Sequence, residues 1–526
     1  MATRVRRRTA ARAFDRATYE QGVEAFQAEL GEERYRTLAG LSDVSAQAAV
    51  YDRHADLFTS DAVDTLRRSV DAGGDQADRD RALLAFAGDG YLSRAAGGLT
   101  DRIITEEKRA VIHWRGEEIR YRDARDRISS IGERGERNGL FDQWLRAVEA
   151  INPLRVERLD AMQAGAVALG FDDRVEMVRS TRGWNPDELA AVTRGALDAS
   201  ETGYYAAMRR LLARAGIEQG DGSLADAWFG LRGTGWDAWF EPRRFLRIME
   251  GTVAGLGMDL AIRAGVTIDV ESRPTTAQGA FFVPVRIPGD VRLVLNPRGG
   301  WEDMGAALHA TGRLEHSVHV PAGTPASLGL LGDPSVSQGY AFLMGGLLGD
   351  PEWLEESVGM GDSAQVAFVD FFGLAMLYRL RLGGGQLIYE LGLHRGGEHA
   401  IHRALYAGTL GLLTGVGWPE EMYLASDHDL SHSGTALRAT MLAGILDQEL
   451  RRRYPGGWWR SPEAGALMRE LFERGSAWNA ERVVAHLGYD SLDWRPVLRK
   501  IRTQLIGEMS GYGGPNITTR AGTRKI

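Results

Sequence analysis

The sequence predicts a mainly α-helical protein with one small antiparallel sheet. From residues 17 to 215 the chain is rich in Ala, Leu, Arg and Glu, which favour helices, and only short breaks interrupt it. Around Val266 the helical period gives way to alternating apolar and polar residues, as in half-buried strands. Beyond residue 300, helical patterns and helix start signals return. These three observations predict the fold class.

In the first half, Gly- and Pro-containing segments predict the ends of helices. The breaks lie at residues 71–74, 97–98, 152–153 and 183–186. Residues 105–138 are so highly charged that we expect long, largely exposed helices there, with opposite charges three or four positions apart.

Three alternating runs predict a sheet at residues 266–296. The apolar positions are Val266, Ile268 and Val270, then Val283, Val285 and Ile287, then Val291, Leu293 and Leu295. Pro284 has no N–H to give to a neighbouring strand, so the middle strand should lie at an edge or carry a bulge. Residues 288–290 predict the turn into the last strand.

The second half predicts another series of helices. One occupies residues 300–316, directly after the sheet. Asp333 followed by Pro334 is a start signal for a helix over about 335–349. We expect further helices at about 363–382, 399–415, 433–454 and 462–475, and a short terminal unit at 480–507. The glycines at 383–385 predict a turn, and Trp458 with Trp459 predicts a packed corner between helices.

We expect four segments along the chain. Residues 1–16 predict a disordered basic arm, 17–225 an N-terminal helical lobe, 226–509 a second lobe that contains the sheet, and 510–526 a disordered tail. With no apolar run of about 20 residues and no apolar stretch behind the basic start, we expect a cytoplasmic protein without a membrane partner. The net charge of −8 is spread along the chain, which argues against nucleic acid as a partner.

The chain has no cysteine. Disulfides, thiolate zinc sites, cysteine-ligated iron-sulfur clusters and a cysteine nucleophile are therefore excluded, and His, Asp and Glu remain as the main possible metal ligands.

The helix at 300–316 carries the most informative pattern. His309, Arg313 and His316 fall on one face of it, with the spacing by which a His-Glu-x-x-His helix presents two imidazoles to zinc. Ala310 stands where such a helix has the glutamate that takes a proton from zinc-bound water, and Arg313 stands where it has the second histidine. A guanidinium has no lone pair for a metal.

Together, the helical first half, the three-strand insert, the His309 helix and the segment from Ser337 to Phe342 resemble the thimet oligopeptidase and oligopeptidase F family of zinc peptidases. The Taq-type carboxypeptidases are its distant relatives. The resemblance covers about 227–505. It implies a zincin-like oligopeptidase fold with two helical lobes around a groove, and an edge strand beside the zinc helix that receives peptide by strand addition.

The resemblance also implies a ligand set that this chain has largely lost. In the family, a glutamate about 25 residues after the motif is the third zinc ligand; Gln338 lies 25 residues after Arg313. His309 is kept, while Ala310, Arg313 and Gln338 replace the general base and two ligands. Late tyrosines that bind the oxyanion or substrate correspond to His432 and Ala436.

We therefore expect no zinc and no peptidase activity. Two metal ligands are missing, and a permanent cation stands at one of their positions. The sequence predicts an inactive homologue that binds a peptide or partner protein through Arg313, His316, Gln338, Tyr340 and His432. The Arg313 guanidinium should bond the Gln338 amide and one of the acids Glu302, Asp303 and Glu315, or hold a carboxylate or phosphate.

Two alternatives stay open. In the first, His309 and His316 are ordinary core histidines bonded to carbonyls. In the second, the protein is an active hydrolase or metallopeptidase with a relocated site, since eight of the 11 histidines lie between His309 and His432. Candidate metal ligands are His394, His399 and His402; a second polar cluster combines Asp427, His428, Asp429 and His432 with Ser431 or Ser433.

Overall fold

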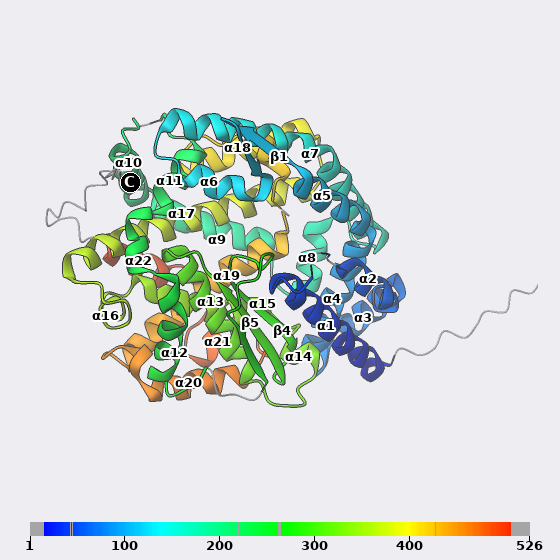
Figure 1. Ribbon diagram of the computed structural model, residues 1–526. Coiled ribbons are helices and arrows are strands. Elements are labelled where there is room, and N and C mark those ends of the chain that lie inside the picture. Colours follow the sequence, from blue (N-terminus) through cyan, green and yellow to red (C-terminus); the bar gives the residue numbers. More distant parts are fainter. Residues whose placement is uncertain are drawn as a thin grey trace, which may run out of the picture.

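The structure is a computed structural model that describes residues 15–42, 44, 46–218, 220–260, 265–426 and 428–505 (Figure 1). Nearly all of the expected basic arm and the whole expected tail at 510–526 lie outside the described residues. The fold is mainly helical, as the sequence predicts, and it has two small sheets where the sequence predicts one. Within the described ranges, no helix combines the length and the apolar character that crossing a bilayer requires.

The first half consists of helices and one β-hairpin. The helices are α1 (Arg16–Leu38), α2 (Gln47–Arg53), α3 (Ser60–Ala72), α4 (Ala77–Ala95), α5 (Gly97–Arg109), α6 (Ala124–Ser130), α7 (Arg134–Ala168), α8 (Arg174–Arg182), α9 (Pro186–Ala199), α10 (Glu201–Arg214), α11 (Leu224–Arg232) and α12 (Phe245–Gly255). The hairpin pairs β1 (Val111–Trp114) with β2 (Glu117–Arg120).

The hairpin corrects the expectation of long helices over 105–138. Ile112 and Ile119 face each other across the two strands and are buried, while the charged neighbours point outward. Arg115 and Gly116 form the turn with φ of 51° and 85°, a left-handed pair that matches the twist of a two-residue hairpin. The many charged residues in this segment obscured the short alternation of apolar and polar residues around Ile112 and Ile119.

The predicted break at 152–153 is also wrong, because α7 runs straight through Pro153. Proline removes one helical hydrogen bond. Around it, the Arg155 guanidinium donates to the carbonyl of Val148 at 3.0 Å, and the Asn152 amide donates to the carbonyl of Glu421 at 2.8 Å. These contacts and the buried residues on both sides of the proline keep the helix continuous.

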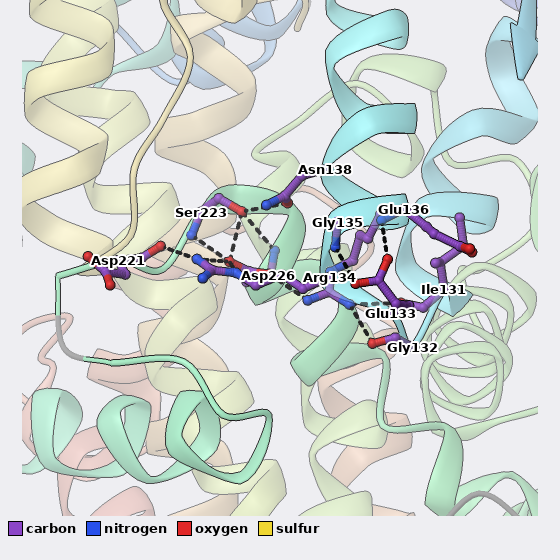
Figure 2. A network of polar contacts seen from close by, with 11 residues as sticks. Ile131, Gly132, Glu133, Arg134, Gly135, Glu136, Asn138, Asp221, Ser223 and Asp226 are labelled. Atoms are coloured by element: carbon purple, nitrogen blue, oxygen red, sulfur yellow. Dashed lines mark hydrogen bonds and ion pairs between the residues drawn. The ribbon is translucent and has the colours of Figure 1, made fainter.

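A buried ionic network joins the start of α7 to the start of α11 (Figure 2). Arg137 donates to Asp226 at 2.6 Å, and both side chains are 1% exposed. Arg134 adds a longer bond at 3.2 Å. Asp226 also closes a capping box with Ser223 at the N-terminus of α11. One carboxylate thus fixes both helix starts.

The second sheet contains β3 (Val266–Asp269), β4 (Gly279–Arg286) and β5 (Asp290–Asn296), in the order β3-β5-β4. β4 and β5 form the predicted antiparallel hairpin, but β3 pairs parallel to β5, so the sheet is mixed rather than antiparallel. The prediction for Pro284 is confirmed twice: β4 lies at an edge, and its register shifts between Pro284 and Arg286.

Helix α1 explains why β3 does not pair with β4. The connection from β3 to β4 is bonded to the C-terminal end of α1: Ala277 donates to the carbonyl of Leu38 at 2.8 Å, and Arg273 and Thr276 donate to that of Ala39. The chain is held at α1 before it returns to the far edge of the sheet. No short-range pattern in the sequence encodes this detour.

Helix α1 lies directly on the sheet (Figure 1). A side chain at Gly31 would come within 2.6 Å of the carbonyl oxygen of Pro284, so this approach requires glycine. Nearby, the Tyr35 hydroxyl donates to Asp269 at 2.9 Å. The first helix of the chain and the strand insert form one packed unit.

The remaining helices follow the sheet. They are α13 (Trp301–Val318), α14 (Ala326–Gly329), α15 (Pro334–Gly345), α16 (Pro351–Trp353), α17 (Asp362–His394), α18 (His399–Thr414), α19 (Leu430–Arg453), α20 (Pro462–Phe472), α21 (Ala480–His486) and α22 (Arg495–Leu505). Short turns of 3-10 or π type complete the chain: η1 (Ala55–Leu57), η2 (Tyr121–Asp123), η3 (Thr234–Trp239), η4 (Pro242–Arg244), η5 (Gly346–Gly349), η6 (Leu354–Val358), η7 (Glu420–Leu424) and η8 (Trp458–Arg460).

Most of these helices confirm the predicted ones, but the glycines at 383–385 do not form a turn. They lie inside α17, which continues to His394. A side chain at Gly385 would come within 2.6 Å of Leu410, and one at Gly384 within 3.0 Å of Thr193. The glycines let α18 and α9 approach α17 closely.

The largest core runs from Val175 to Ile501. Trp458 and Trp459 are buried in it, which confirms the packed corner. This core contains residues on both sides of position 225, such as Tyr204 and Trp301, so the division into two lobes there stays a prediction.

Candidate functional site

The start of α13 is fixed by the turn between the sheet and the helix. Asp303 accepts hydrogen bonds from the backbone N–H groups of Arg298 at 2.7 Å and Gly299 at 3.1 Å. Gly300 has φ of 91°, and Trp301 is buried and donates through its indole N–H to the carbonyl of Arg232. The helix therefore begins one residue after the predicted position and presents His309 as expected.

Gly312 sets the crossing of α13 with α15. A side chain there would come within 2.7 Å of the carbonyl oxygen of Tyr340 and 2.8 Å of the α-carbon of Ala341. The His309 ring lies 5.3 Å from the ring of Phe342, centroid to centroid. Arg313 follows His309 by one helical turn on α13, and Gln338 precedes Phe342 by one turn on α15. Because His309 and Phe342 are in contact, the four side chains lie on the same side of the helix pair. We call His309, Ala310, Arg313 and Gln338 the α13–α15 site.

Arg313 has no anionic partner among the described residues. Its guanidinium lies over the ring of Phe282 in β4, 5.0 Å from the centroid, a cation–π contact. The side chain is half-buried, and its Nε is fully buried without a hydrogen-bond partner in the part of the chain that the structure describes. Burial and repulsion from Arg34 lower the pKa of Arg313.

The expected acidic partners of Arg313 lie elsewhere. Glu302 is 3.5 Å from Arg379, Asp303 caps the turn before α13, and Glu315 is 3.7 Å from His319. No hydrogen bond to Gln338 forms either, among the described residues. That part of the prediction is wrong, because each acid pairs with a cation or an N–H group other than that of Arg313.

Of His309 and Ala310, only His309 has a side chain that can bind or transfer a proton, and its imidazole is neutral. Burial lowers the pKa of His309 to about 4, with smaller contributions from the charges of Arg313 and Arg379. The imidazole is therefore neutral near pH 7. Ala310 is 2% exposed, and its methyl group packs in the core, so no base stands at this position.

His316 and Tyr340 lie inside the core. The His316 Nε2 is 3.1 Å from the carbonyl oxygen of Gly475, and burial lowers its pKa to about 4. The Tyr340 ring packs edge-on against Phe472, 4.7 Å between centroids, and is 0% exposed. Neither side chain reaches a surface where it could meet a ligand, so both fall outside the α13–α15 site. His316 fits the description of a core histidine bonded to a carbonyl.

Gln338 and His432 remain accessible. Gln338 is half-buried and makes no hydrogen bond to another described side chain or backbone group. His432 is exposed in the first turn of α19, where Asp429 caps its backbone N–H. Gln338 therefore joins the site, whereas no contact among the described residues links His432 to it.

The three histidines expected for a relocated metal lie in one region: the rings of His399 and His402 are 6.5 Å apart, centroid to centroid, and the proximity of His402 adds to the lowering of the pKa of His394. His394 is buried, with its Nε2 2.6 Å from the carbonyl oxygen of His428. His399 lies 3.7 Å from Asp160, and His402 is buried beside Tyr389. Across the described ranges, no three His, Asp or Glu side chains converge in a way that could hold a metal ion. Asp427 of the second predicted cluster lies outside the described residues.

Two pairs of polar residues escaped the sequence analysis as pairs, although His428 belongs to the second predicted cluster. His428 has φ of 44° and its Nδ1 lies 3.5 Å from Glu390, both side chains being buried. Arg34 of α1 belongs to the second pair: its positive charge adds to burial in lowering the pKa of Arg313, which lies over Phe282 of β4. The residues in each pair are far apart in sequence, so only the tertiary fold brings them together.

Comparison with known proteins gives structural likeness alone. No protein-family model matches the chain, and no curated protein matches its sequence. A structure assigned to oligoendopeptidase F of Bacillus anthracis superposes with a TM-score of 0.62 at 13% identity, over 92% of this chain and 89% of that one. Pz peptidase A with an inhibitor gives 0.63 at 13% identity, over 93% and 95%. Trypanosoma cruzi metallocarboxypeptidase 1 gives 0.59 at 13% identity, over 93% and 99%.

These likenesses extend over almost the full length of each chain. They establish the oligopeptidase-like zincin fold that the sequence predicts. At 13% identity, these similarities support the same fold but say nothing about the reaction or the ligand of this protein.

Proposed function

We propose that this protein is a non-catalytic homologue of the oligopeptidase-type zinc peptidases, which binds a peptide or a partner protein at the α13–α15 site. The proposal depends mainly on one observation: Arg313 lies over the ring of Phe282 and has no anion beside it among the described residues. In the sequence resemblance, Arg313 stands at the position of a metal ligand. A cation without a partner in a half-buried position favours binding of an anionic or hydrogen-bond-accepting ligand.

The donor set does not suit zinc. Structural and catalytic zinc sites use three or four His, Cys or carboxylate ligands. Here the only imidazole of the α13–α15 site is the neutral His309; the other two polar groups are the Gln338 amide and the Arg313 guanidinium, and the guanidinium has no lone pair and repels a divalent cation. Ala310 cannot accept a proton from a water molecule. Zinc-dependent hydrolysis is therefore not part of the proposal.

Metal content and peptide cleavage test the catalytic half of the proposal. We expect tag-free protein to contain far less than about one zinc ion per chain and to leave a quenched peptide library intact. The matched comparison is the triple variant A310E/R313H/Q338E, which restores two ligands and the base and should bind about one zinc ion. Wild-type protein with one zinc per chain and cleavage activity would overturn the proposal and direct attention to His394, His399 and His402.

Peptide capture tests the binding half. Wild-type protein should retain a subset of a synthetic random peptide library, and R313Q should retain about tenfold less, since a charged hydrogen bond is lost. R36Q is the control, because Arg36 is an exposed cation on α1 and takes no part in the site. Equal capture by wild type and R313Q would contradict binding at this site.

A further inference from the structure

A cavity of about 270 Å³ lies beside α1, between α4 and the segment that leads into α15. The half-buried rings of Tyr51 and Phe86 form its apolar wall, and Phe26 and Phe58, each 1% exposed, pack behind them. Phe26 lies 5.0 Å from Tyr51 and 5.5 Å from Phe86, and Phe58 lies 5.2 Å from Phe86, centroid to centroid. The walls therefore suit a flat, apolar group.

The charged residues of the cavity leave one positive charge uncompensated. Asp89 and Arg182 both line it, and they form an ion pair with each other. Arg34 lines it as well, is exposed, and forms no ion pair or hydrogen bond with another described residue. Phe26, Leu30 and Arg34 are spaced by four residues, so one side of α1 supplies both the buried residues behind the apolar wall and the cation.

The same end of α1 brings Arg34 toward Arg313. Gly31, three residues before Arg34, abuts Pro284 and Val285 of β4. Phe282, two residues before Pro284, carries the Arg313 guanidinium on its ring. The repulsion between the two guanidinium groups, which adds to burial in lowering the pKa of Arg313, agrees with this placement. β4 has no strand partner on that side among the described strands.

We propose that Arg34 and Arg313 together bind one anionic group of the ligand, a carboxylate or a phosphate, and that the aromatic cavity beside Arg34 holds an apolar or aromatic group of the same ligand. Two guanidinium groups that approach each other without a described carboxylate between them are a strong anion site, because each donates a fork of hydrogen bonds. This inference builds on the proposed binding function and names the chemistry of its ligand.

Small aromatic anions test the inference without requiring peptide binding. 3-Phenylpropionate and phenyl phosphate carry the two anionic groups, and 3-phenylpropanamide is their neutral analogue. We expect calorimetry or NMR titration of the full chain to detect at least one of the two anions, and the amide to bind at least about tenfold more weakly. The anion that binds more tightly shows whether the site prefers a carboxylate or a phosphate.

Variants assign the site. R34Q and R313Q should each weaken anion binding by about tenfold, R34K and R313K by less, and R36Q not at all. Thermal melts confirm that each variant is folded. Replacing 3-phenylpropionate by acetate should also weaken binding, because the cavity then stays empty.

The outcomes separate this inference from the proposed function. If peptides are captured but acid and amide probes bind equally, the inference is wrong and the binding function stands. If aromatic anions bind through Arg34 and Arg313 while no peptide is captured, the site is real and the peptide-binding proposal fails. If neither anion binds wild-type protein, or if both anions bind R34Q and R313Q as tightly as wild type, the inference is overturned.

Discussion

At the scale of single residues, hydrogen-bond partners decide what each polar side chain near α13 contributes. Arg313 reaches a half-buried position with no described anion, so it is available to a ligand. Tyr340, on the facing helix, is fully buried, and its hydroxyl finds no partner among the described residues. A buried hydroxyl without a partner costs about 1–3 kcal/mol of folding free energy.

Removing the Tyr340 hydroxyl should therefore stabilise the protein. Y340F keeps the ring packed against Phe472 and eliminates the unpaired group, so we expect the free energy of unfolding to rise by about 1 kcal/mol. Urea unfolding followed by tryptophan fluorescence measures the change. In the matched control, Y204F, the lost hydroxyl donates to the carbonyl of Thr414 at 2.6 Å, so that variant should be about 1 kcal/mol less stable. A loss of stability in both variants would contradict this account of Tyr340.

At the scale of elements, a few buried contacts connect helices that are far apart in the chain. The Asp226 carboxylate joins the starts of α7 and α11 through Arg137 and Arg134. Burial opposes its charge, but the hydrogen bonds from Arg137, Ser223 and Arg134 outweigh burial, and the pKa of Asp226 is lowered overall. Breaking such a pair leaves a buried charge without compensation.

Truncation of Asp226 should therefore be costly. D226A leaves the Arg137 guanidinium, 1% exposed, without its carboxylate, and we expect unfolding to require about 3–5 kcal/mol less free energy. The exposed pair of Arg243 and Glu241 provides the control: E241A should change stability by less than about 0.5 kcal/mol. If D226A unfolds at the same urea concentration as E241A, the network does not stabilise the two helix starts.

At the scale of the whole molecule, buried neutral histidines make stability depend on pH. The pKa values of His309 and His316 are lowered to about 4, chiefly by burial, and burial also lowers that of His394. In the unfolded chain each titrates near 6.5. Below pH 6.5 the unfolded chain binds protons at these histidines, whereas the folded chain does not. Their contribution to the free energy of unfolding is therefore fully present above pH 6.5 and decreases as the pH falls toward 4.

We expect the urea midpoint to be nearly constant from pH 7.5 to pH 6.5 and to decrease from pH 6.5 to pH 5. Each of His309 and His316 should contribute about 1.4 kcal/mol per pH unit below 6.5. H316Q keeps a polar group near the carbonyl of Gly475. It should reduce the slope of the unfolding free energy against pH by the amount that corresponds to about one proton taken up on unfolding. Stability that is unchanged or higher at pH 5 would show that the three imidazoles protonate inside the folded protein.

Much of the fold follows from local patterns. The starts of α13 and α15, the edge position of Pro284 and the helices from α18 to α20 agree with the sequence, because capping residues, proline geometry and helical periodicity act over a few residues. The failures have a common cause. The glycines inside α17, Pro153 inside α7 and the parallel β3 all depend on partners many residues away, and tertiary packing overrides local preference there.

For the candidate site, the residue types can be read from the chain without a structure: His309, Ala310 and Arg313 on α13, with Gln338 on α15, cannot supply the usual donors for zinc. Which of these residues are accessible, that His316 and Tyr340 belong to the core, and that Arg34 of the first helix acts electrostatically on Arg313 follow only from the tertiary structure. The physical reason is that ligand chemistry is a property of the side chain, whereas burial and charge pairing depend on segments that meet only when the chain folds.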